Sequence, residues 1–180
     1  TCALPISVNI DEATIDKYGQ FPFKRDVYAQ LINDIYQRNA GLVVFNVLMP
    51  EVDRQGGDKQ LASLMGTVPV ILPNTPSNVN KNQPKNPGAA IIGAEYSETI
   101  LQYPGMIANI PMLENAAAGV GTTNTLPEID GVVRRVPLVA QVDGRLFPQL
   151  SLEVLRVAAG DPNFQIKLNE SGVEKMRIPQ

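Results

Sequence analysis

The hydrophobic pattern of the first fifty residues predicts a strand, a helix and a second strand. Residues 6–10 are a short β-type run that ends at two carboxylates. Apolar side chains then recur every three and four residues over 27–36 and form one broad helical face. Asp26 is placed as the N-cap of this helix and Gly41 as its stop. Residues 42–45 are an unbroken apolar run, as expected for a strand buried on both faces of a parallel sheet.

These three elements form a βαβ unit. The crossover between parallel strands is right-handed in about 98% of cases, and a connection of this length joins neighbouring strands. We therefore expect the strands over 6–10 and 42–45 to be adjacent and parallel in one sheet.

The rest of the chain continues to alternate strands and helices. Pro69 delays the strand predicted over 68–72 or moves it toward an edge. Asp143 and Gly144 predict a two-residue type I′ hairpin turn. The predicted fold class is α/β: a three-layer domain with a mostly parallel central sheet, plus a β-hairpin and an antiparallel C-terminal hairpin, in a single domain over residues 1–180. The other predicted elements are a helix over 58–65, a strand over 89–93, a helix over 113–118, hairpin strands over 132–142 and 145–147, a helix over 148–159 and a terminal hairpin that turns at 169–172.

Two segments are predicted to be irregular. Residues 73–87 hold four prolines and five asparagines. Such a composition buries too little apolar surface to order itself, so we expect a long exposed loop. Gly119 and Gly121 belong to a fragment of a nucleotide-binding glycine pattern, which a plain turn explains better.

Charge and residue inventory exclude several classes of function. The net charge is −3 and no basic stripe could neutralise phosphates, so we expect no nucleic-acid partner. The chain has no histidine and one cysteine, Cys2, which excludes Ser-His-Asp and Cys-His catalysis and histidine metal sites. Mg²⁺ or Ca²⁺ held by carboxylates, through Asp11, Glu12 and Asp53, is an open alternative. We predict no catalytic residue, no cofactor and no metal.

Polar side chains gather where the first two predicted strands end. Asp11 and Glu12 follow the first strand and Asn46 follows the second. Ligands of open α/β sheets bind outside these carboxyl ends. Arg25 enters the intervening helix at the same edge, so we expect Asp11, Arg25 and Asn46 to form one site for a small polar or anionic ligand. The structural alternative is that Arg25 neutralises Asp11 and pins the loop, while Glu12 points into solvent.

Further charged residues are weaker candidates for ligand binding. Asp53 and Arg54 lie in a Gly-rich loop after the second strand, where most charges are only solvated. Arg134 and Arg135 are neighbours on a predicted strand, whose successive side chains point to opposite faces. At most one of the two arginines can therefore reach a pocket.

Two blocks of motifs run from residue 6 to about Gly160. The first holds Ile10-Asp11-Glu12, the aromatic-proline knot 21–25 (FPFKR), segment 40–46 (AGLVVFN) and the acidic loop 52–58 (VDRQGGD). The second holds Asn124, segment 130–138 (DGVVRRVPL) and Phe147-Pro148. In order and spacing, these blocks resemble the CHASE family of extracellular sensory domains, in its second type.

Two positions depart from that family pattern. The knot has Phe21 and Phe23 where the family has tryptophan, which keeps the packing role but removes indole N–H donors. Asn46 stands where the family has an aspartate. Its amide cannot take the metal-binding or acid–base role that the carboxylate of that aspartate would have. Arg134 is the more typical of the two arginines, and the resemblance selects it as a ligand-binding candidate.

The resemblance implies the extracytoplasmic sensory domain, periplasmic or extracellular, of a transmembrane receptor. The expected partners are a small polar ligand, flanking membrane helices of the parent chain, and a cytoplasmic output domain: a histidine kinase, a serine/threonine kinase or a nucleotide cyclase. A homodimer fits such receptors, although no heptad pattern demonstrates one. Two alternatives stay open: a small-molecule hydrolase or transferase that uses the strand-end carboxylates, and a structural or partner-binding module without a pocket.

Overall fold

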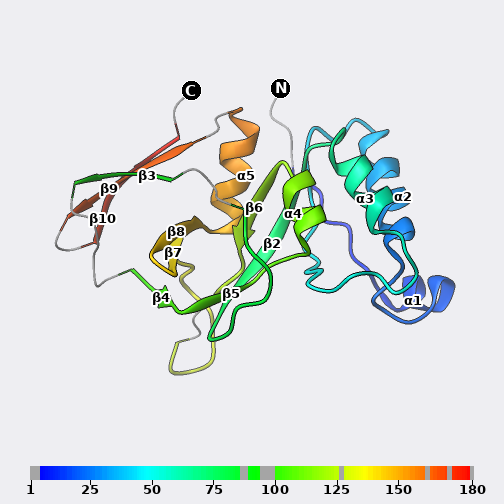
Figure 1. Cartoon of the computed structure of the whole chain (residues 1–180), viewed down its shortest axis with the longest axis horizontal. Helices are drawn as coiled ribbons and strands as arrows, with labels where there is room; N and C mark the ends of the chain where they lie inside the picture. The colour runs from blue at the N-terminus through cyan, green and yellow to red at the C-terminus, as the bar shows by residue number, and fades with distance from the viewer. Residues whose placement is uncertain are drawn as a thin grey trace.

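A mostly parallel sheet lies between helices in the computed structural model (Figure 1). Its central strand, β2 (Val70–Ser77), pairs in parallel with β1 (Val43–Val44) on one side and with β6 (Gly119–Thr122) on the other. β5 (Gly105–Ile107) pairs antiparallel with the last residues of β2. The structure describes residues 5–85, 89–93, 100–125, 128–160, 163–169 and 172–178.

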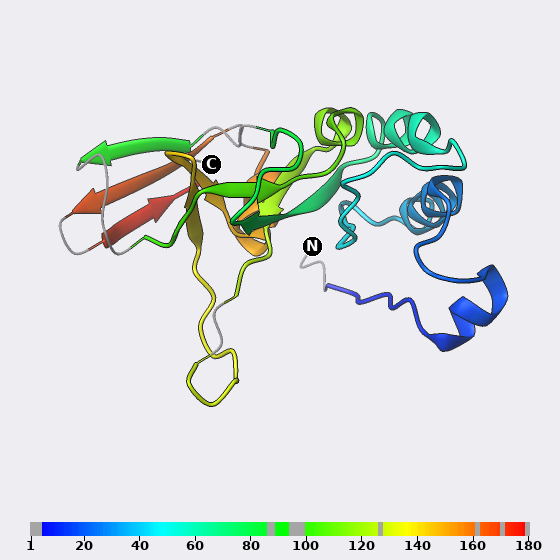
Figure 2. The ribbon, with the colours of Figure 1, turned by 60° about the horizontal axis from the view of Figure 1, so that its bottom comes forward.

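Helices cover both faces of this sheet. Val120 of β6 packs into the core beneath α2, α3 and α4. Gly119 and Gly121 point to the opposite face, where a Cβ on Gly121 would come within 2.5 Å of the backbone of Leu150 in α5. The predicted three-layer α/β fold is therefore confirmed (Figures 1 and 2). The helices of the described residues are α1 (Glu12–Tyr18), α2 (Arg25–Tyr36), α3 (Asp58–Met65), α4 (Pro111–Ala116) and α5 (Leu150–Ala158).

The main core fills the space between the sheet and α2, α3 and α4. Tyr28 and Ile32 of α2 are fully buried there, as the helical spacing predicts. The rings of Tyr28 and Phe45 meet with centroids 5.0 Å apart, and Leu72 of β2 joins the same cluster. Each large apolar side chain buried in this way contributes roughly 1.5–3 kcal/mol, which fixes α2 on the sheet.

Two small sheets extend the central one. In the first, β9 (Phe164–Asn169) pairs in parallel with β3 (Ala89–Gly93) and antiparallel with β10 (Gly172–Arg177), so the C-terminal hairpin is confirmed. In the second, β7 (Val139–Val142) lies between β4 (Gln102–Tyr103) and β8 (Arg145–Pro148). Asp143 and Gly144 join β7 to β8 with φ of +47° and +73°. Positive φ at both residues confirms the type I′ turn.

The strand predicted over residues 6–10 is wrong. Ile6 and Val8 are 86% and 60% exposed, and the segment runs extended beside the body of the protein into α1 (Figure 2). Asp11 starts that helix as its N-cap instead of ending a strand. An alternating apolar pattern makes a strand only where a partner edge is formed, and here β1 pairs with β2 alone.

The exposed loop predicted over residues 73–87 is wrong for its first third. β2 continues through Ser77, and Pro73 and Asn74 are buried. The carbonyl groups of Pro69 and Ile71 accept hydrogen bonds from the segment of β1. Because every second residue of a strand directs its main-chain groups to the same side, those of Pro73 also point to that side, beyond the end of β1. A proline is tolerated there because no neighbouring strand requires its missing N–H. Residues 78–81 and Gln83 are exposed as predicted, whereas Asn82, Pro84 and Lys85 are half-buried. Residues 86–87 lie outside the described residues.

Several element boundaries also differ from the prediction. The helix predicted to run from an Asp58 cap through Met65 is confirmed, although its N-cap is Gly57 and Asp58 is its first residue. α2 begins at Arg25 and places Asp26 in its first turn. Gly119 begins a strand and not a turn. The strand predicted from Val132 begins only at Val139, and Pro148 ends β8 and does not begin α5. In each case tertiary pairing sets the boundary, which local propensity does not determine.

Candidate functional site

Arg25, Asp53 and Asp58 form an ion cluster where α2 and α3 begin, which we call the Arg25 cluster. The main-chain N–H of Arg25 donates to Oδ2 of Asp53 at 3.0 Å. The guanidinium Nε lies 3.4 Å from Oδ1 of Asp58, an ion pair without hydrogen-bond geometry. Nη2 donates to the carbonyl of Glu51 at 3.3 Å. Arg25 and Asp58 are both buried, so the pair is shielded from solvent.

Asp53 anchors the loop that follows Glu51. Its Oδ2 accepts the N–H of Gly57 at 3.3 Å, and its Oδ1 accepts the N–H of Gln55 at 3.0 Å. Burial raises the pKa of Asp53, but main-chain N–H donors and the Arg25 guanidinium lower it by more, so the pKa lies below its ordinary value. The carboxylate is engaged by the protein itself, which makes Asp53 a structural clamp.

Gly57 allows this loop to pack directly on α2. A Cβ at Gly57 would lie 2.7 Å from the main-chain nitrogen of Asp26 and 2.8 Å from Cβ of Arg25. The Arg25 cluster thus joins α2, the loop and α3 into one corner. Of the predicted site residues, the structure brings Arg25 and Asp53 together, and they are hydrogen-bonded to each other.

Asp11 and Glu12 lie elsewhere, at the start of α1. Oδ1 of Asp11 accepts the hydroxyl of Thr14 at 2.6 Å and its N–H at 2.9 Å. These two hydrogen bonds lower the pKa of Asp11. Glu12 is exposed. The predicted ion pair between Arg25 and Asp11 is wrong, because the partner of Arg25 is Asp58.

Asn46 and Arg54 are exposed and lie outside the Arg25 cluster. Asn46 follows β1, as predicted, but no strand over 6–10 exists to bring Asp11 beside it. Arg54 stands next to Asp53 in the loop without entering its hydrogen bonds. A role in ligand binding for Asp11, Glu12, Asn46 and Arg54 stays a prediction.

Arg134 belongs to the loop over residues 128–138, which projects from the sheet (Figure 2). Its guanidinium pairs with Asp130 at 2.7 Å and with Glu128 at 3.2 Å. Arg135 also pairs with Glu128, at 3.3 Å. The inference that the two arginines point to opposite faces is therefore wrong, because no strand includes them and both reach one carboxylate. A ligand role for Arg134 stays a prediction.

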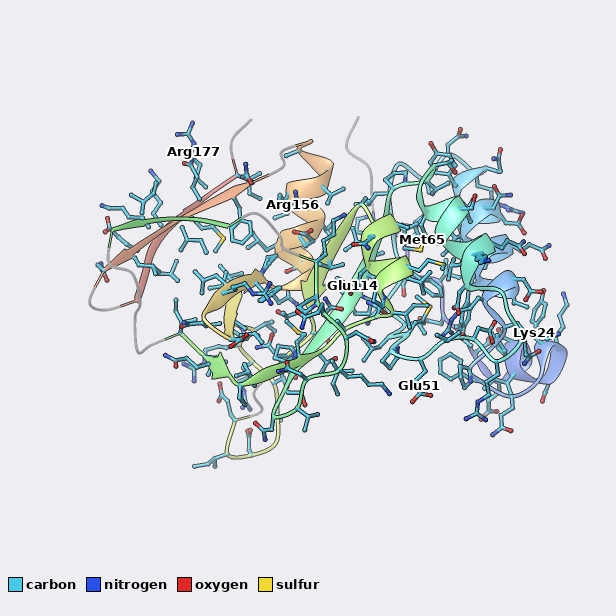
Figure 3. The ribbon with its side chains drawn as sticks, in the orientation of Figure 1. Lys24, Glu51, Met65, Glu114, Arg156 and Arg177 are labelled. Carbon is cyan, nitrogen blue, oxygen red and sulfur yellow. The ribbon has the colours of Figure 1, made fainter. Side chains whose placement is uncertain are left out.

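A buried polar network lies at the edge of the central sheet where its parallel strands end, which we call the carboxyl edge. Its members, Asn74 of β2, Asn109 and Glu114 of α4, form what we call the Asn109 network. Asn109 Nδ2 lies within hydrogen-bond distance of Pro73 O (2.9 Å), Glu114 Oε1 (3.0 Å) and Asn74 Oδ1 (3.1 Å). Its Oδ1 accepts the N–H of Met49 at 2.8 Å. Figure 3 shows Glu114 on the side of α4 that faces the strands.

Some polar atoms at the carboxyl edge have no partner among the described residues. Asn74, 1% exposed, pairs through Oδ1 while its Nδ2 has none. Asn124, two residues after β6, is 8% exposed, and neither side-chain atom has a partner. An unpartnered buried amide costs about 1–3 kcal/mol, so such groups call for a functional explanation.

Residues 81–85 cross over the Asn109 network, and we call them the strap. Nδ2 of Asn82 donates to the carbonyls of Pro50 (2.9 Å) and Ala108 (3.0 Å). The main-chain N–H of Lys85 donates to Glu114 Oε2 at 2.8 Å. No residue of the strap belongs to a hydrophobic cluster of the described residues. The strap is thus held by polar contacts.

A comparison with protein families decides the identity of the domain. The model of the CHASE2 domain matches residues 5–180. The chain belongs to the CHASE2 family. This family comprises extracellular sensory domains of signalling receptors, which are not catalytic, and the resemblance found in the sequence is confirmed. No curated protein and no solved structure matches this CHASE2 domain.

Two shallow hollows stand out on the surface that the described residues of this CHASE2 domain form. A groove of about 750 Å³ between α2 and α3 is lined by polar side chains such as Gln30 and Gln60. A smaller hollow of about 320 Å³ lies beside the β7–β8 turn and includes Tyr103 and Gln141. None of the predicted site residues lines either hollow.

The described part of this CHASE2 domain contains neither a cluster of metal-binding side chains nor a membrane-spanning helix. Within these residues, no three side chains of Asp, Glu, His or Cys come close enough together to hold a metal ion. Among the same residues, no helix has both the length and the hydropathy of a membrane-spanning segment.

One indication of the carboxyl-edge site is present in the sequence. Asn74 follows the apolar run over 68–72 by two residues, where a strand-end polar group is expected, but the prolines around it favoured a loop. Asn109 and Glu114 carry no local motif, because their meeting with Asn74 depends on the pairing of β2 with β5. Asn124 is indicated only by the family pattern.

Proposed function

We propose that this CHASE2 domain, as a single sensory unit, is the extracytoplasmic part of a transmembrane receptor and senses a small polar molecule at the carboxyl edge. The cytoplasmic output is a histidine kinase, a serine/threonine kinase or a nucleotide cyclase. Membrane helices of the parent chain connect the two parts, and a homodimer is the working arrangement.

The proposal rests on the amide of Asn124, which has no hydrogen-bond partner in the part of the chain that the structure describes. It lies just beyond the end of β6, where open α/β sheets bind their ligands. A buried amide that offers both a donor and an acceptor suits a neutral or zwitterionic polar molecule, which would form the missing hydrogen bonds. The half-buried residues Thr75 and Thr123, whose hydroxyl oxygens lie 3.3 Å apart, add polar groups to the same edge.

Signalling requires two arrangements of the domain whose balance the ligand shifts. A ligand moves that balance only by its difference in affinity for the two arrangements. The strap can take part in such a two-state change. Its hydrogen bonds over the carboxyl edge are lost at low net cost in free energy when a ligand forms equivalent hydrogen bonds with the same groups. The Arg25 cluster and the main core form the rigid frame against which the strap moves.

A metabolite screen tests the proposal. The unfolding temperature of the domain is measured with individual small polar metabolites, and each hit is repeated on Asn124→Leu, a variant of similar side-chain size. We expect at least one compound to raise the unfolding temperature of the wild type but not of the variant. If every hit stabilises both proteins equally, the ligand does not bind at Asn124 and the proposed site is wrong.

A further inference from the structure

Asn74 and Asn124 lie on the same face of the central sheet, on neighbouring segments of chain. Asn74 of β2 is in register with Thr122 of β6, so Asn124 lies two residues further along. The main-chain N–H of Thr123 donates to the carbonyl of Asn74 at 3.0 Å, which continues the parallel pairing past the end of β6. Because side chains alternate between the two faces, Asn124 shares the face of Asn74 and Thr123 points to the opposite one. The hydroxyl oxygens of Thr75 and Thr123, 3.3 Å apart, are the neighbouring pair on that opposite face.

The two asparagines are close enough for one small molecule to contact both. Neighbouring strands are about 4.8 Å apart and each residue advances about 3.3 Å, so one strand across and two residues along give about 8 Å between the α-carbons. Since both side chains extend from the same face, the gap between their amide groups is no longer than a molecule of a few heavy atoms. Both residues are buried, so a molecule that reaches them is shielded from water.

The hydrogen bonds of Asn109 determine which atom of Asn74 is free. Oδ1 of Asn109 accepts the main-chain N–H of Met49 at 2.8 Å, so Asn109 turns its donor, Nδ2, toward Asn74. Asn74 accepts this hydrogen bond through Oδ1 at 3.1 Å, and its Nδ2 has no partner among the described residues. The free atom of Asn74 is therefore a donor.

Asn124 offers a donor and an acceptor side by side. Neither its Nδ2 nor its Oδ1 has a partner within the described residues. The two atoms of one amide group point in nearly parallel directions, so a single oxygen atom, such as that of water, does not form good hydrogen bonds with both. A ligand that satisfies both needs an N–H and a C=O on the same edge. Primary carboxamides, lactams and ureas have this edge, whereas a trans peptide bond directs its N–H and C=O to opposite sides.

The surroundings of the two amides favour a ligand without net charge. In the described part of the chain, no charged side chain forms a hydrogen bond or ion pair with Asn74 or Asn124. Pro76 follows Asn74 on the same face and is paired with Met106 of β5, and both are buried apolar residues. Moving a charge from water into such surroundings costs more free energy than hydrogen bonds to neutral amides return.

We infer that Asn74 and Asn124 together recognise the amide group of a small neutral molecule: a primary carboxamide, a lactam or a urea. The N–H of the ligand donates to Oδ1 of Asn124. Its carbonyl oxygen accepts one hydrogen bond from Nδ2 of Asn124 and, with its second lone pair, another from Nδ2 of Asn74. All three open atoms of the two asparagines are then satisfied. The inference rests on the proposed function and specifies its ligand class.

Acetamide and 2-pyrrolidone are the probes, a primary carboxamide and a lactam. The controls are N-methylacetamide, which has a trans amide and is smaller than 2-pyrrolidone, and acetate, which is charged. Each compound is titrated into the isotope-labelled domain while NMR follows the side-chain amide signals of Asn74 and Asn124. We expect saturable shifts of these signals with both probes, at a Kd on the order of 1 mM, and at least about tenfold weaker binding of both controls. Equal binding of either control, or no saturable shift with either probe, would overturn the inference.

Size-matched leucine variants test the two amides separately. Asn74→Leu leaves Nδ2 of Asn109 with two other acceptors, so we expect this variant to fold, which circular dichroism checks. Asn74→Leu and Asn124→Leu should each bind acetamide at least about tenfold more weakly than the wild type. Asn78→Leu, which replaces an exposed asparagine just after β2, is the matched control and should bind like the wild type. Unchanged affinity in either buried variant contradicts the inference, and the comparison of compounds on the wild type needs no variant at all.

Failure of this inference leaves the proposed function separately testable. If neither probe binds but the metabolite screen finds a ligand of another class that depends on Asn124, the amide class is wrong and the sensory site stands. If both probes bind at the two asparagines while receptor output never responds to any ligand, the binding site stands and the sensing role is wrong.

Discussion

Arg25 and Asp53 are joined by a main-chain hydrogen bond and not by a side-chain ion pair. The main-chain N–H of Arg25 donates to the Asp53 carboxylate at 3.0 Å, while the Arg25 guanidinium pairs with Asp58. The first N–H groups of a helix have no partner within the helix, so a carboxylate from a distant loop here supplies the cap that Lys24 does not. This contact places the loop of residues 51–57 relative to α2.

Replacing Asp53 with alanine should destabilise the domain. Three main-chain N–H donors, those of Arg25, Gln55 and Gly57, would lose their acceptor. We expect the free energy of unfolding to fall by about 1–3 kcal/mol in urea denaturation. Arg54→Met, next in sequence and exposed, is the control and should change stability by less than about 0.5 kcal/mol. A stability of Asp53→Ala equal to that of the control would show that the clamp contributes nothing.

The Asp53 clamp should also depend on pH. The pKa of Asp53 in the folded domain is below its ordinary value, so the unfolded chain takes up a proton first as the pH falls. The stabilisation is fully present above the unfolded pKa of about 3.9 and is lost as the pH falls through the folded pKa. The stability difference between wild type and Asp53→Asn, measured by urea unfolding, should therefore shrink below about pH 4. A difference that stays constant into the acid range refutes this assignment.

Gly57 and Gly41 provide a matched pair of glycine substitutions. A Cβ at Gly57 would press against backbone of α2, whereas nothing lies within 4 Å of a Cβ at Gly41. Gly57→Ala should lose about 1–3 kcal/mol of stability through overpacking. Gly41→Ala should be neutral or slightly stabilising. Thermal unfolding of both variants checks this, and equal transition temperatures would contradict the close approach.

Glu153 forms a buried ion pair that fastens α5 to β6. Its carboxylate accepts hydrogen bonds from Nε and Nη2 of Arg156 at 2.8 and 2.6 Å and from the N–H of Val120 at 3.0 Å. Figure 3 labels Arg156 on α5. Glu153→Gln should lower the free energy of unfolding by about 3–5 kcal/mol, because it removes the negative charge from a buried ion pair. Glu174→Gln removes an exposed ion pair to Lys167 and should cost less than about 1 kcal/mol. Similar losses in both variants would refute the role of burial.

Local patterns predicted those parts of the fold that depend on local interactions. The apolar spacing of α2, the helix over 58–65 and the turn at Asp143 and Gly144 are properties of neighbouring residues, and all three are confirmed. Residues 6–10 also have a clear local pattern, that of a strand, yet they form no strand. Strand formation needs a partner edge, which is decided by tertiary structure and not by the segment itself.

The candidate site was predictable only in part for the same reason. The sequence placed Arg25 and Asp53 near one edge, but it gave no means of finding that Asp58 and not Asp11 is the ion-pair partner of Arg25. Asn74 and Glu114 are linked through Asn109 because β2 extends through a segment that composition assigns to a loop. Composition reports what a segment can bury on average, whereas specific pairings with β5 and β6 order this one.

Stability and receptor output of Asn124→Leu, measured together, test the central claim most directly. Leucine removes a buried amide that has no partner among the described residues, so the ligand-free domain should become about 1–3 kcal/mol more stable. In the full receptor, the cytoplasmic output of this variant should no longer respond to the stimulus, because the ligand loses its hydrogen bonds to the amide. A variant that is less stable than the wild type but still responds would show that Asn124 is structural, and would contradict a sensing site at the carboxyl edge.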